Sequence, residues 1–166
     1  RIVALMSAMP QEGKTTTTLA LGRQCAESGA RVLIIDTDLR RRALSAHLGQ
    51  PVRQGFVELI EGQALLENCL HADPLSAAMI LPLSSADTGR RDVFFTHDLA
   101  PVFERLRNHF DIILVDTAPL LPLAEPRLVA VGARQIDPLG AHAVEIRRSN
   151  GDVLRRAITG RGTASR

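Results

Sequence analysis

Eight consecutive residues near the start of the chain have the types and spacing of a loop that binds phosphate groups. They match the pattern GxxxxGK(S/T) at every position except the first, and in order they are Ala8, Met9, Pro10, Gln11, Glu12, Gly13, Lys14 and Thr15. In such a loop the glycine lets the backbone approach the phosphates, the lysine reaches the β and γ oxygens, and the hydroxyl binds Mg²⁺. We therefore predict that residues 8–16, Thr16 included, bind ATP, and that Thr15 binds Mg²⁺.

Lys14 is the only lysine in a chain that contains 20 lysine and arginine residues in all. Arginine occupies every other basic position, so the compact ammonium group is retained at one place only. Arginine does not replace lysine where a compact ammonium group on a flexible side chain must contact a phosphate, because the guanidinium group is planar and larger. This distribution supports a phosphate-binding role for Lys14.

Three aspartates follow two strongly apolar segments. Asp36 ends RVLIID and is separated from Asp38 by one residue, and Asp116 ends DIILVD. A carboxylate at a strand tip beside the loop can hold the Mg²⁺ shell, which is the role of a Walker B aspartate. Two like charges so close together are unfavourable unless a cation lies between them or water surrounds them. There are alternatives to a metal-binding role. Asp116 could instead cap a helix or form a turn, and Asp36 and Asp38 could lie in a turn exposed to water.

The spacing of apolar residues predicts the elements that position these side chains. Helical spacing after the loop predicts a helix to Ser28, ended by Gly29, and further helical segments are expected up to Leu48 and along residues 55–70 and 99–109. Continuous apolar runs predict buried strands at residues 1–6, 31–36, 77–83 and 111–116. Because strands and helices alternate, we predict a single α/β domain: a P-loop NTPase-like, mostly parallel sheet flanked by helices, with ligands at the carboxyl ends of the strands.

Length and composition narrow the functional classes. A chain of 166 residues that is 45% hydrophobic is long enough for one domain with a core. The formal net charge of +2 provides no basic field, so no nucleic-acid partner is expected, and no apolar run is long enough to predict a membrane span. Cys25 and Cys69 lack metal-ligand spacing and are expected to be structural. Because Arg1 directly precedes an apolar run, we expect the chain to be a piece of a longer polypeptide.

The loop, the segment DTDLR at residues 36–40 and the segment DIILVDTAP at residues 111–119 occur in the order and spacing of a known family. Together they resemble the bacterial tyrosine kinase (BY-kinase) family of exopolysaccharide and capsule biosynthesis, over residues 1–131. The chromosome- and septum-positioning ATPases have a similar fold, but they carry an additional lysine at the position that Met9 occupies here. The kinase family is therefore favoured.

The resemblance implies how the site holds its cofactors. Lys14 would contact the phosphates of ATP, and Thr15 would bind Mg²⁺. Asp38 and Asp116 would be the outer carboxylates of the metal site.

The resemblance also implies which groups act on the acceptor. Asp36 would be the base that accepts the proton of a tyrosine hydroxyl, and a strand-tip carboxylate opposite the γ-phosphate could reach that hydroxyl. Arg40, together with Lys14, is assigned to catalysis, where it would stabilise charge or contact a neighbouring subunit. The alternative for Arg40 is a solvated helix start, because Arg41 and Arg42 continue the basic run.

The sequence departs from the family pattern in its acceptor residues. Members of the family end in a cluster of tyrosines that one subunit presents to the next, whereas this chain contains no tyrosine. Three alternatives stay open: a kinase that modifies a partner, a kinase separated from its tail, and an ATP-driven assembly switch or ATPase without tyrosine transfer. The first loop position holds Ala8 instead of glycine, which a small side chain allows.

Residues 132–166 also depart from the family, because they are polar and rich in glycine and arginine. We expect this segment to be divergent and partly disordered, with a short strand at residues 143–146, a helix at 152–158 and disorder at the end.

The leading interpretation is an ATP- and Mg²⁺-dependent protein-tyrosine kinase domain at the cytoplasmic face of the bacterial inner membrane. The resemblance implies three partners: a membrane polysaccharide co-polymerase or export protein, in the same chain or separate, a tyrosine substrate in trans, and further copies of the chain in a homo-oligomer.

Overall fold

The computed structural model describes residues 1–7, 9–85, 93–119, 141–149 and 152–158. Within these residues, the strands are β1 (Ile2–Ser7), β2 (Val32–Asp36), β3 (His71–Ala72), β4 (Met79–Leu81), β5 (Ile112–Asp116), β6 (Ala141–Ser149) and β7 (Asp152–Ile158). All seven belong to one sheet with the order β3-β4-β2-β5-β1-β6-β7. The five central strands are parallel, and the two edge strands, β3 and β7, pair antiparallel with their neighbours. The predicted α/β fold with a mostly parallel sheet is confirmed.

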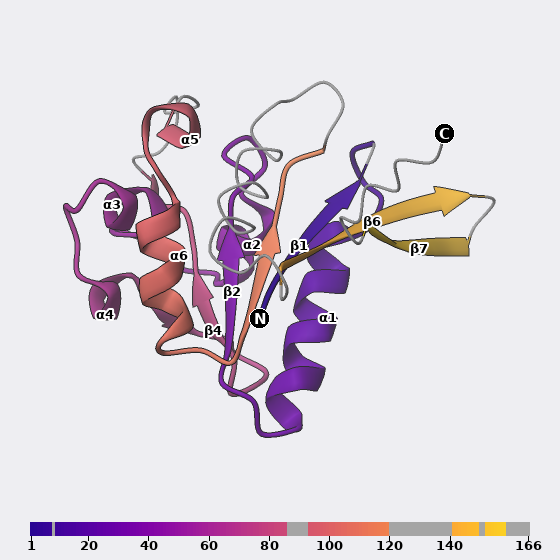
Figure 1. Cartoon of the computed structure of the whole chain (residues 1–166), viewed down its shortest axis with the longest axis horizontal. Coiled ribbons are helices and arrows are strands. Elements are labelled where there is room, and N and C mark those ends of the chain that lie inside the picture. The colour runs from indigo at the N-terminus through magenta and orange to yellow at the C-terminus, as the bar shows by residue number, and fades with distance from the viewer. Residues whose placement is uncertain (8, 86–92, 120–140, 150–151, 159–166) are drawn as a thin grey trace, which may run out of the picture.

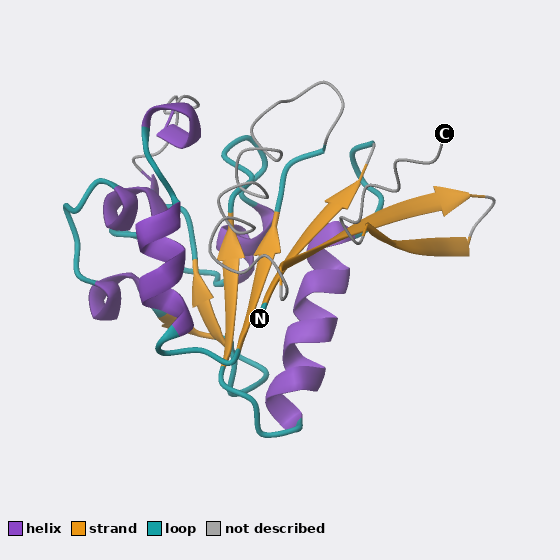
Figure 2. Cartoon of the chain, viewed as in Figure 1, coloured by secondary structure: helices purple, strands orange, loops and turns teal. Residues whose placement is uncertain are grey.

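Helices cover both faces of this sheet (Figures 1 and 2). One face packs against α1 (Lys14–Glu27) and α2 (Ala43–His47). The opposite face packs against four shorter elements: α3 (Phe56–Ile60), α4 (Leu66–Cys69), α5 (Val93–Thr96) and α6 (Ala100–Arg107). In the described part of the chain, no helix is both long enough and apolar enough to span a bilayer.

The residues of β2 show why the central strands are continuously apolar. Leu33 and Ile35 pack into the core on the α3–α6 face, whereas Val32 and Ile34 pack under α1 and α2. Both faces of a parallel strand are covered by helices, so alternation with polar residues is not tolerated. Gly22 lets α1 lie close to this strand, because a Cβ atom at that position would lie 2.5 Å from Ile34 Cδ1.

The register of the sheet brings the predicted site residues to one edge. Asp36 at the end of β2 is directly opposite Asp116 at the end of β5, and Asp116 is opposite Leu5 of β1. Because β1, β2 and β5 run parallel, their carboxyl ends meet at the same edge. The loop that follows β1 therefore begins beside both aspartates.

Two local predictions need revision. The helical segment expected along residues 55–70 is divided into α3 and α4, because Gly62 adopts a left-handed backbone with φ of +70° and ends the first helix. The predicted helix at residues 152–158 is wrong: this segment is β7, paired with β6 from Ser149↔Asp152 outward. The two residues between these strands are Asn150 and Gly151, the pair most typical of a tight hairpin, and this signal outweighs the helical spacing.

The strand predicted at residues 143–146 is confirmed and extends over Ala141–Ser149. The predicted disorder at the end of the chain concerns residues 159–166, which lie outside the described residues. Of the two cysteines expected to be structural, Cys69 is buried and Cys25 is half-buried.

Candidate active site

The predicted phosphate-binding loop connects β1 to α1 through two residues with left-handed backbone. Gln11 has φ of 66°, and Gly13 has φ of 83° and precedes the first residue of α1. This conformation favours glycine, which explains its place immediately before the helix. Met9 is exposed and its N–H donates to the carboxylate of Glu12 at 2.9 Å, which closes the loop. Ala8 lies outside the described residues.

Lys14 lies inside this loop rather than on the surface, with only 7% of the residue exposed. Its Nζ donates a hydrogen bond to Ser7 Oγ at 2.7 Å, and Ser7 Oγ donates to the carbonyl of Met9 at 2.8 Å. Burial lowers the pKa of Lys14, while the negative charges of Asp116 and Asp38 act in the opposite direction. The ammonium group therefore lies within electrostatic reach of both predicted metal carboxylates.

Thr15 and Asp116 are in direct contact across the site. Thr15 Oγ1 donates to Asp116 Oδ2 at 2.6 Å, and Thr18 Oγ1 lies 3.5 Å from Asp116 Oδ1. Burial raises the pKa of Asp116 to about 7, although the hydrogen bond from Thr15 lowers it; the charges of Asp36 and Asp38 raise it further. Three carboxylates thus share a region in which ionising all of them is costly.

Asp36 is completely buried and is held by three donors. Its Oδ1 accepts the N–H of Asp38 at 3.0 Å, and its Oδ2 accepts both the N–H and the hydroxyl of Ser45, at 2.9 and 2.7 Å. Burial raises the pKa of Asp36 to about 6, and the hydrogen bonds from Ser45 limit the rise. A carboxylate with this pKa is largely ionised at pH 7 and has a higher proton affinity than an exposed aspartate.

Asp38 organises the turn between β2 and α2. Its Oδ1 accepts the N–H groups of Arg40 and Arg41, at 3.1 and 3.0 Å, and its carbonyl accepts the N–H of Arg42 at 2.8 Å. The side chain of Arg40 is exposed, and among the described residues its guanidinium forms no ion pair. The contact of Arg40 with the aspartate pair is therefore made by its backbone.

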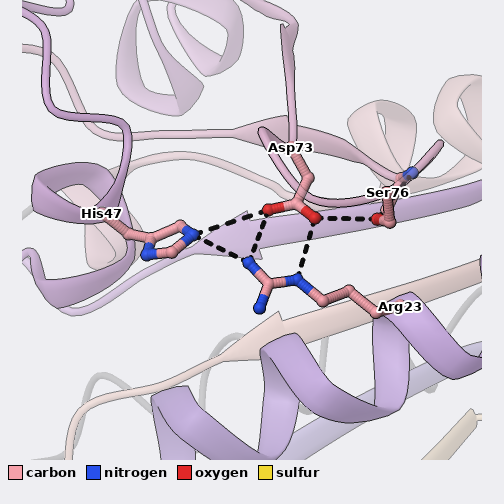
Figure 3. Close-up of polar contacts among 5 residues, drawn as sticks. Arg23, His47, Asp73 and Ser76 are labelled. Atoms are coloured by element: carbon pink, nitrogen blue, oxygen red, sulfur yellow. Dashed lines mark hydrogen bonds and ion pairs between the residues drawn. The ribbon is translucent and has the colours of Figure 1, made fainter.

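A polar cluster attaches α2, which carries Ser45, to the rest of the fold (Figure 3). Arg23 of α1 donates from Nε and Nη2 to the two oxygens of Asp73, at 2.9 and 2.8 Å. His47, at the last position of α2, lies 2.9 Å from Arg23 Nη2 and 3.5 Å from Asp73 Oδ1. Ser76 donates to the other oxygen of Asp73 at 2.8 Å. This cluster connects α1, α2 and the turn between β3 and β4.

Sequence comparison assigns the chain to a family. The sequence model of a family described as AAA domain (AAA_31) matches residues 1–136. The chain belongs to this family. The match contains the loop and all three aspartates described above.

Relatives within the family agree with the resemblance noted from the motifs. The chain is 32% identical to the succinoglycan biosynthesis transport protein ExoP of Rhizobium meliloti over 133 residues, which are 78% of this chain and 17% of ExoP. It is 28% identical to the tyrosine-protein kinase CpsD of Streptococcus pneumoniae over 121 residues, 72% of this chain and 53% of CpsD. The chain thus spans less than a fifth of the one relative and about half of the other.

A solved structure has a fold similar to that of this chain. The kinase domain of VpsO superimposes with a TM-score of 0.70 at 28% identity, covering 79% of this chain and 64% of that domain. The predicted membership of the bacterial tyrosine kinase family and the P-loop NTPase-like fold are confirmed by these comparisons.

The donor set of this AAA domain fits Mg²⁺ together with a nucleotide. Mg²⁺ is usually held through one or two carboxylates and the phosphates of its substrate, not by a complete protein cage. Accordingly, the described residues contain no group of three or more histidine, cysteine, aspartate or glutamate side chains that could hold a metal alone. They do place a hydroxyl and a buried carboxylate in contact, at Thr15 and Asp116, and a cation there would offset the cost of ionising Asp116.

Two site residues were not predicted from the sequence. Ser7 is the partner of Lys14, and its place at the end of β1, just before the loop, is the only signal in the sequence. Ser45 is the principal partner of Asp36, although the sequence shows no acid–base partner close to it. Of the predicted set, Lys14, Thr15 and the three aspartates are brought together, whereas Thr16 and the side chain of Arg40 are exposed.

Proposed function

We propose that this chain is an ATP- and Mg²⁺-dependent protein-tyrosine kinase domain that acts in the biosynthesis and export of a bacterial polysaccharide. The observation that carries the proposal is the pairing of Asp36 with Asp116 at adjacent strand ends, in front of the loop that holds Lys14 and Thr15. In the proposed site the buried carboxylate of Asp116 would lie beside Mg²⁺, and that of Asp36 is one strand away. This arrangement supplies the groups that phosphoryl transfer to a hydroxyl requires.

Each group has a distinct role in the proposed reaction. Lys14 and the N–H groups at the start of α1 bind the phosphates of ATP, and Thr15, Asp38 and Asp116 position Mg²⁺. When bound, Mg²⁺ neutralises charge on the β- and γ-phosphate oxygens.

Asp36 then acts on the acceptor. A tyrosine oxygen forms a bond to the γ-phosphorus, the bond from that phosphorus to ADP breaks, and the tyrosine proton moves to Asp36. The products are ADP and phosphotyrosine, and Asp36 returns its proton to solvent. The pKa of Asp36, raised to about 6 by burial, supports this role, because such a carboxylate is ionised at pH 7 yet binds a proton more readily than an exposed aspartate.

The acceptor tyrosine comes from outside these 166 residues, because they contain none. We propose that it lies on a partner or on another part of the complete protein, and that the domain works in a homo-oligomer at the cytoplasmic face of the inner membrane. The partner is a membrane protein of polysaccharide export. The similarity to a segment of ExoP, named a succinoglycan biosynthesis transport protein, supports this context.

The decisive experiment is incubation of the chain with Mg-ATP and a tyrosine-containing acceptor peptide, followed by detection of phosphotyrosine. Asp36→Asn should abolish the signal, whereas Asp98→Asn should leave it unchanged, because Asp98 is an exposed carboxylate whose contact is with the N–H of Ala100, at the start of α6. ATP turnover without phosphotyrosine on any acceptor would contradict the kinase assignment. That outcome would favour an ATP-driven assembly switch, the alternative consistent with a chain that lacks tyrosine.

A further inference from the structure

A cavity of about 300 Å³ opens beside the turn that follows β2. The residues that line it include Arg41, Arg42, Ser45, Pro51, Val52 and Ser85. Nothing in the proposed catalytic roles accounts for this cavity. Its volume is sufficient for one or two side chains, at the lower end of the range for ligand sites.

The cavity shares one wall residue, Ser45, with the proposed active site. This serine forms part of the cavity wall, and its N–H and hydroxyl donate to Asp36. Arg41 makes a second connection, because its N–H donates to Asp38 Oδ1 at 3.0 Å. A ligand in this cavity would therefore lie against the serine that holds the proposed base, Asp36.

Two arginines give the wall of the cavity a positive charge. Among the described residues, neither Arg41 nor Arg42 forms an ion pair. Arg42 is instead fixed by two carbonyl groups, because its Nη2 donates to the oxygen of Leu83 at 3.1 Å and to that of Ser84. An arginine held in this way keeps its full charge for a ligand.

Two further features of Arg42 indicate a binding function. Its Nε is buried and has no hydrogen-bond acceptor within the described ranges, which is unusual for a charged group in a folded protein. Its backbone adopts the left-handed region, with φ of 52°, a strained conformation for a residue with a side chain. A strained residue with an unused buried donor at the wall of a cavity is consistent with a site that is completed by an anion.

We propose that this cavity binds the carboxylate side chains that flank the acceptor tyrosine, so that the chain selects tyrosines in acidic segments. The inference rests on the proposed kinase function and names its substrate class. Arg41 is the exposed cation that contacts the acidic residue, and Arg42 is the fixed cation behind it. Ser45 connects the wall of this cavity to Asp36, the proposed base.

The test uses three peptides that differ only in the residues on either side of a single tyrosine: glutamate, glutamine or lysine. We expect the KM for the glutamate peptide to be about tenfold below that for the glutamine peptide, because a charge-assisted hydrogen bond strengthens binding by about that factor. Arg41→Gln should raise the KM for the glutamate peptide to the value for the glutamine peptide. Arg41→Glu should reverse the preference toward the lysine peptide.

Arg105→Gln is the matched control, because it removes an exposed arginine from α6 on the opposite face of the sheet and should leave the peptide preference as it is. Equal KM values for the three peptides, or a preference that Arg41→Glu does not change, would overturn the inference while phosphotyrosine formation still supports the kinase function.

A binding measurement separates the two proposals. A fluorescent glutamate peptide with phenylalanine in place of tyrosine should bind the chain, and Arg41→Glu should weaken that binding about tenfold or more. Binding that depends on Arg41 in a chain that forms no phosphotyrosine would support the acidic-segment site and reject the kinase function. Binding that Arg41→Glu leaves unchanged would reject the site, provided that circular dichroism shows the variant to be folded.

Discussion

Ser45 donates both its backbone N–H and its hydroxyl to a single oxygen of Asp36, at 2.9 and 2.7 Å. The same hydroxyl accepts the N–H of Leu83 at 2.8 Å, so the serine is itself held in place by the segment that follows β4. With only 6% of Ser45 exposed, water does not replace these contacts readily. Ser45 is therefore a positioning residue for the proposed base.

Replacement of Ser45 tests this relationship. Ser45→Ala should lower kcat for tyrosine phosphorylation about tenfold, because one hydrogen bond to a charged group is lost. The KM for ATP should change less than about twofold, because the loop contacts the nucleotide and is untouched. Ser45→Thr should recover most of kcat, and Ser28→Ala, which removes an exposed hydroxyl at the end of α1, should have no effect. A Thr variant as slow as the Ala variant would refute the role of the hydroxyl.

Lys14 is the residue whose loss should remove nucleotide binding. Lys14→Met should weaken ATP affinity about 100-fold or more, because the ammonium that reaches the β and γ oxygens is absent. Lys14→Arg should not restore affinity, since the planar guanidinium does not fit a site in which Lys14 is 7% exposed. Isothermal titration calorimetry with Mg-ATP measures both variants, and thermal melting without nucleotide verifies folding. Normal affinity in a folded Lys14→Met variant would remove the loop from the proposed function.

Asp116 should make the nucleotide-free protein less stable as the pH rises. Its pKa is raised to about 7 by burial, compared with an ordinary value of 3.8, so between these values the folded state binds more protons than the unfolded state. The free energy of unfolding therefore falls as pH increases from about 4 to 7, and Asp36, with a pKa of about 6, acts in the same direction.

Asp116→Asn removes this cost. At pH 8 the variant should be more stable than the wild type by roughly 1–2 kcal/mol. This is less than the full pKa shift of Asp116 would give at about 1.4 kcal/mol per pKa unit. Near pH 4 the two proteins should differ little in stability. Urea unfolding at both pH values, in the absence of Mg²⁺ and ATP, measures the change. A variant that is less stable at pH 8 by as much as at pH 4 would contradict the assignment of the raised pKa.

Asp73 should have the opposite dependence on pH. The hydrogen bond from Arg23 holds the pKa of Asp73 below its ordinary value, so the stability it contributes is present above the pKa of the unfolded state. This stability is lost as pH falls through the lower folded value. Asp73→Asn should lower the free energy of unfolding at pH 7 by about 3 kcal/mol, because it leaves a partly buried guanidinium without its carboxylate.

Asp111→Asn provides the comparison for Asp73→Asn. Asp111 forms a similar two-pronged pair with Arg31, at 2.7 and 3.1 Å, but on an exposed surface, where ion pairs contribute little. In the same urea unfolding experiment, Asp111→Asn should therefore lower the free energy of unfolding much less than Asp73→Asn does. If the two variants lost equal stability, the cluster around Asp73 would not be what holds α2 in place.

The parts of the fold that were correctly predicted are those set by short stretches of sequence. The strands β1, β2 and β5 are continuous apolar runs, and the loop requires a glycine in left-handed backbone next to a lysine and a threonine. The helix predicted at residues 152–158 was wrong because seven residues of mixed polarity fit both the spacing of a helix and the alternation of a strand. Pairing with β6 makes this segment a strand. The missed β3 has only two residues, too few to form a pattern.

By itself, the sequence determined that this chain has the motif of a phosphate-binding loop and aspartates at two strand ends, because each of these features depends on residues within about ten positions of one another. The tertiary structure decided which of these groups meet. Asp36 and Asp116 are 80 positions apart in the sequence, and only the register of β2 against β5 places them opposite each other. The partners of Lys14 and Asp36, which are Ser7 and Ser45, likewise follow from burial: a charged group removed from water must have a hydrogen-bond partner, but the fold selects which residue provides it.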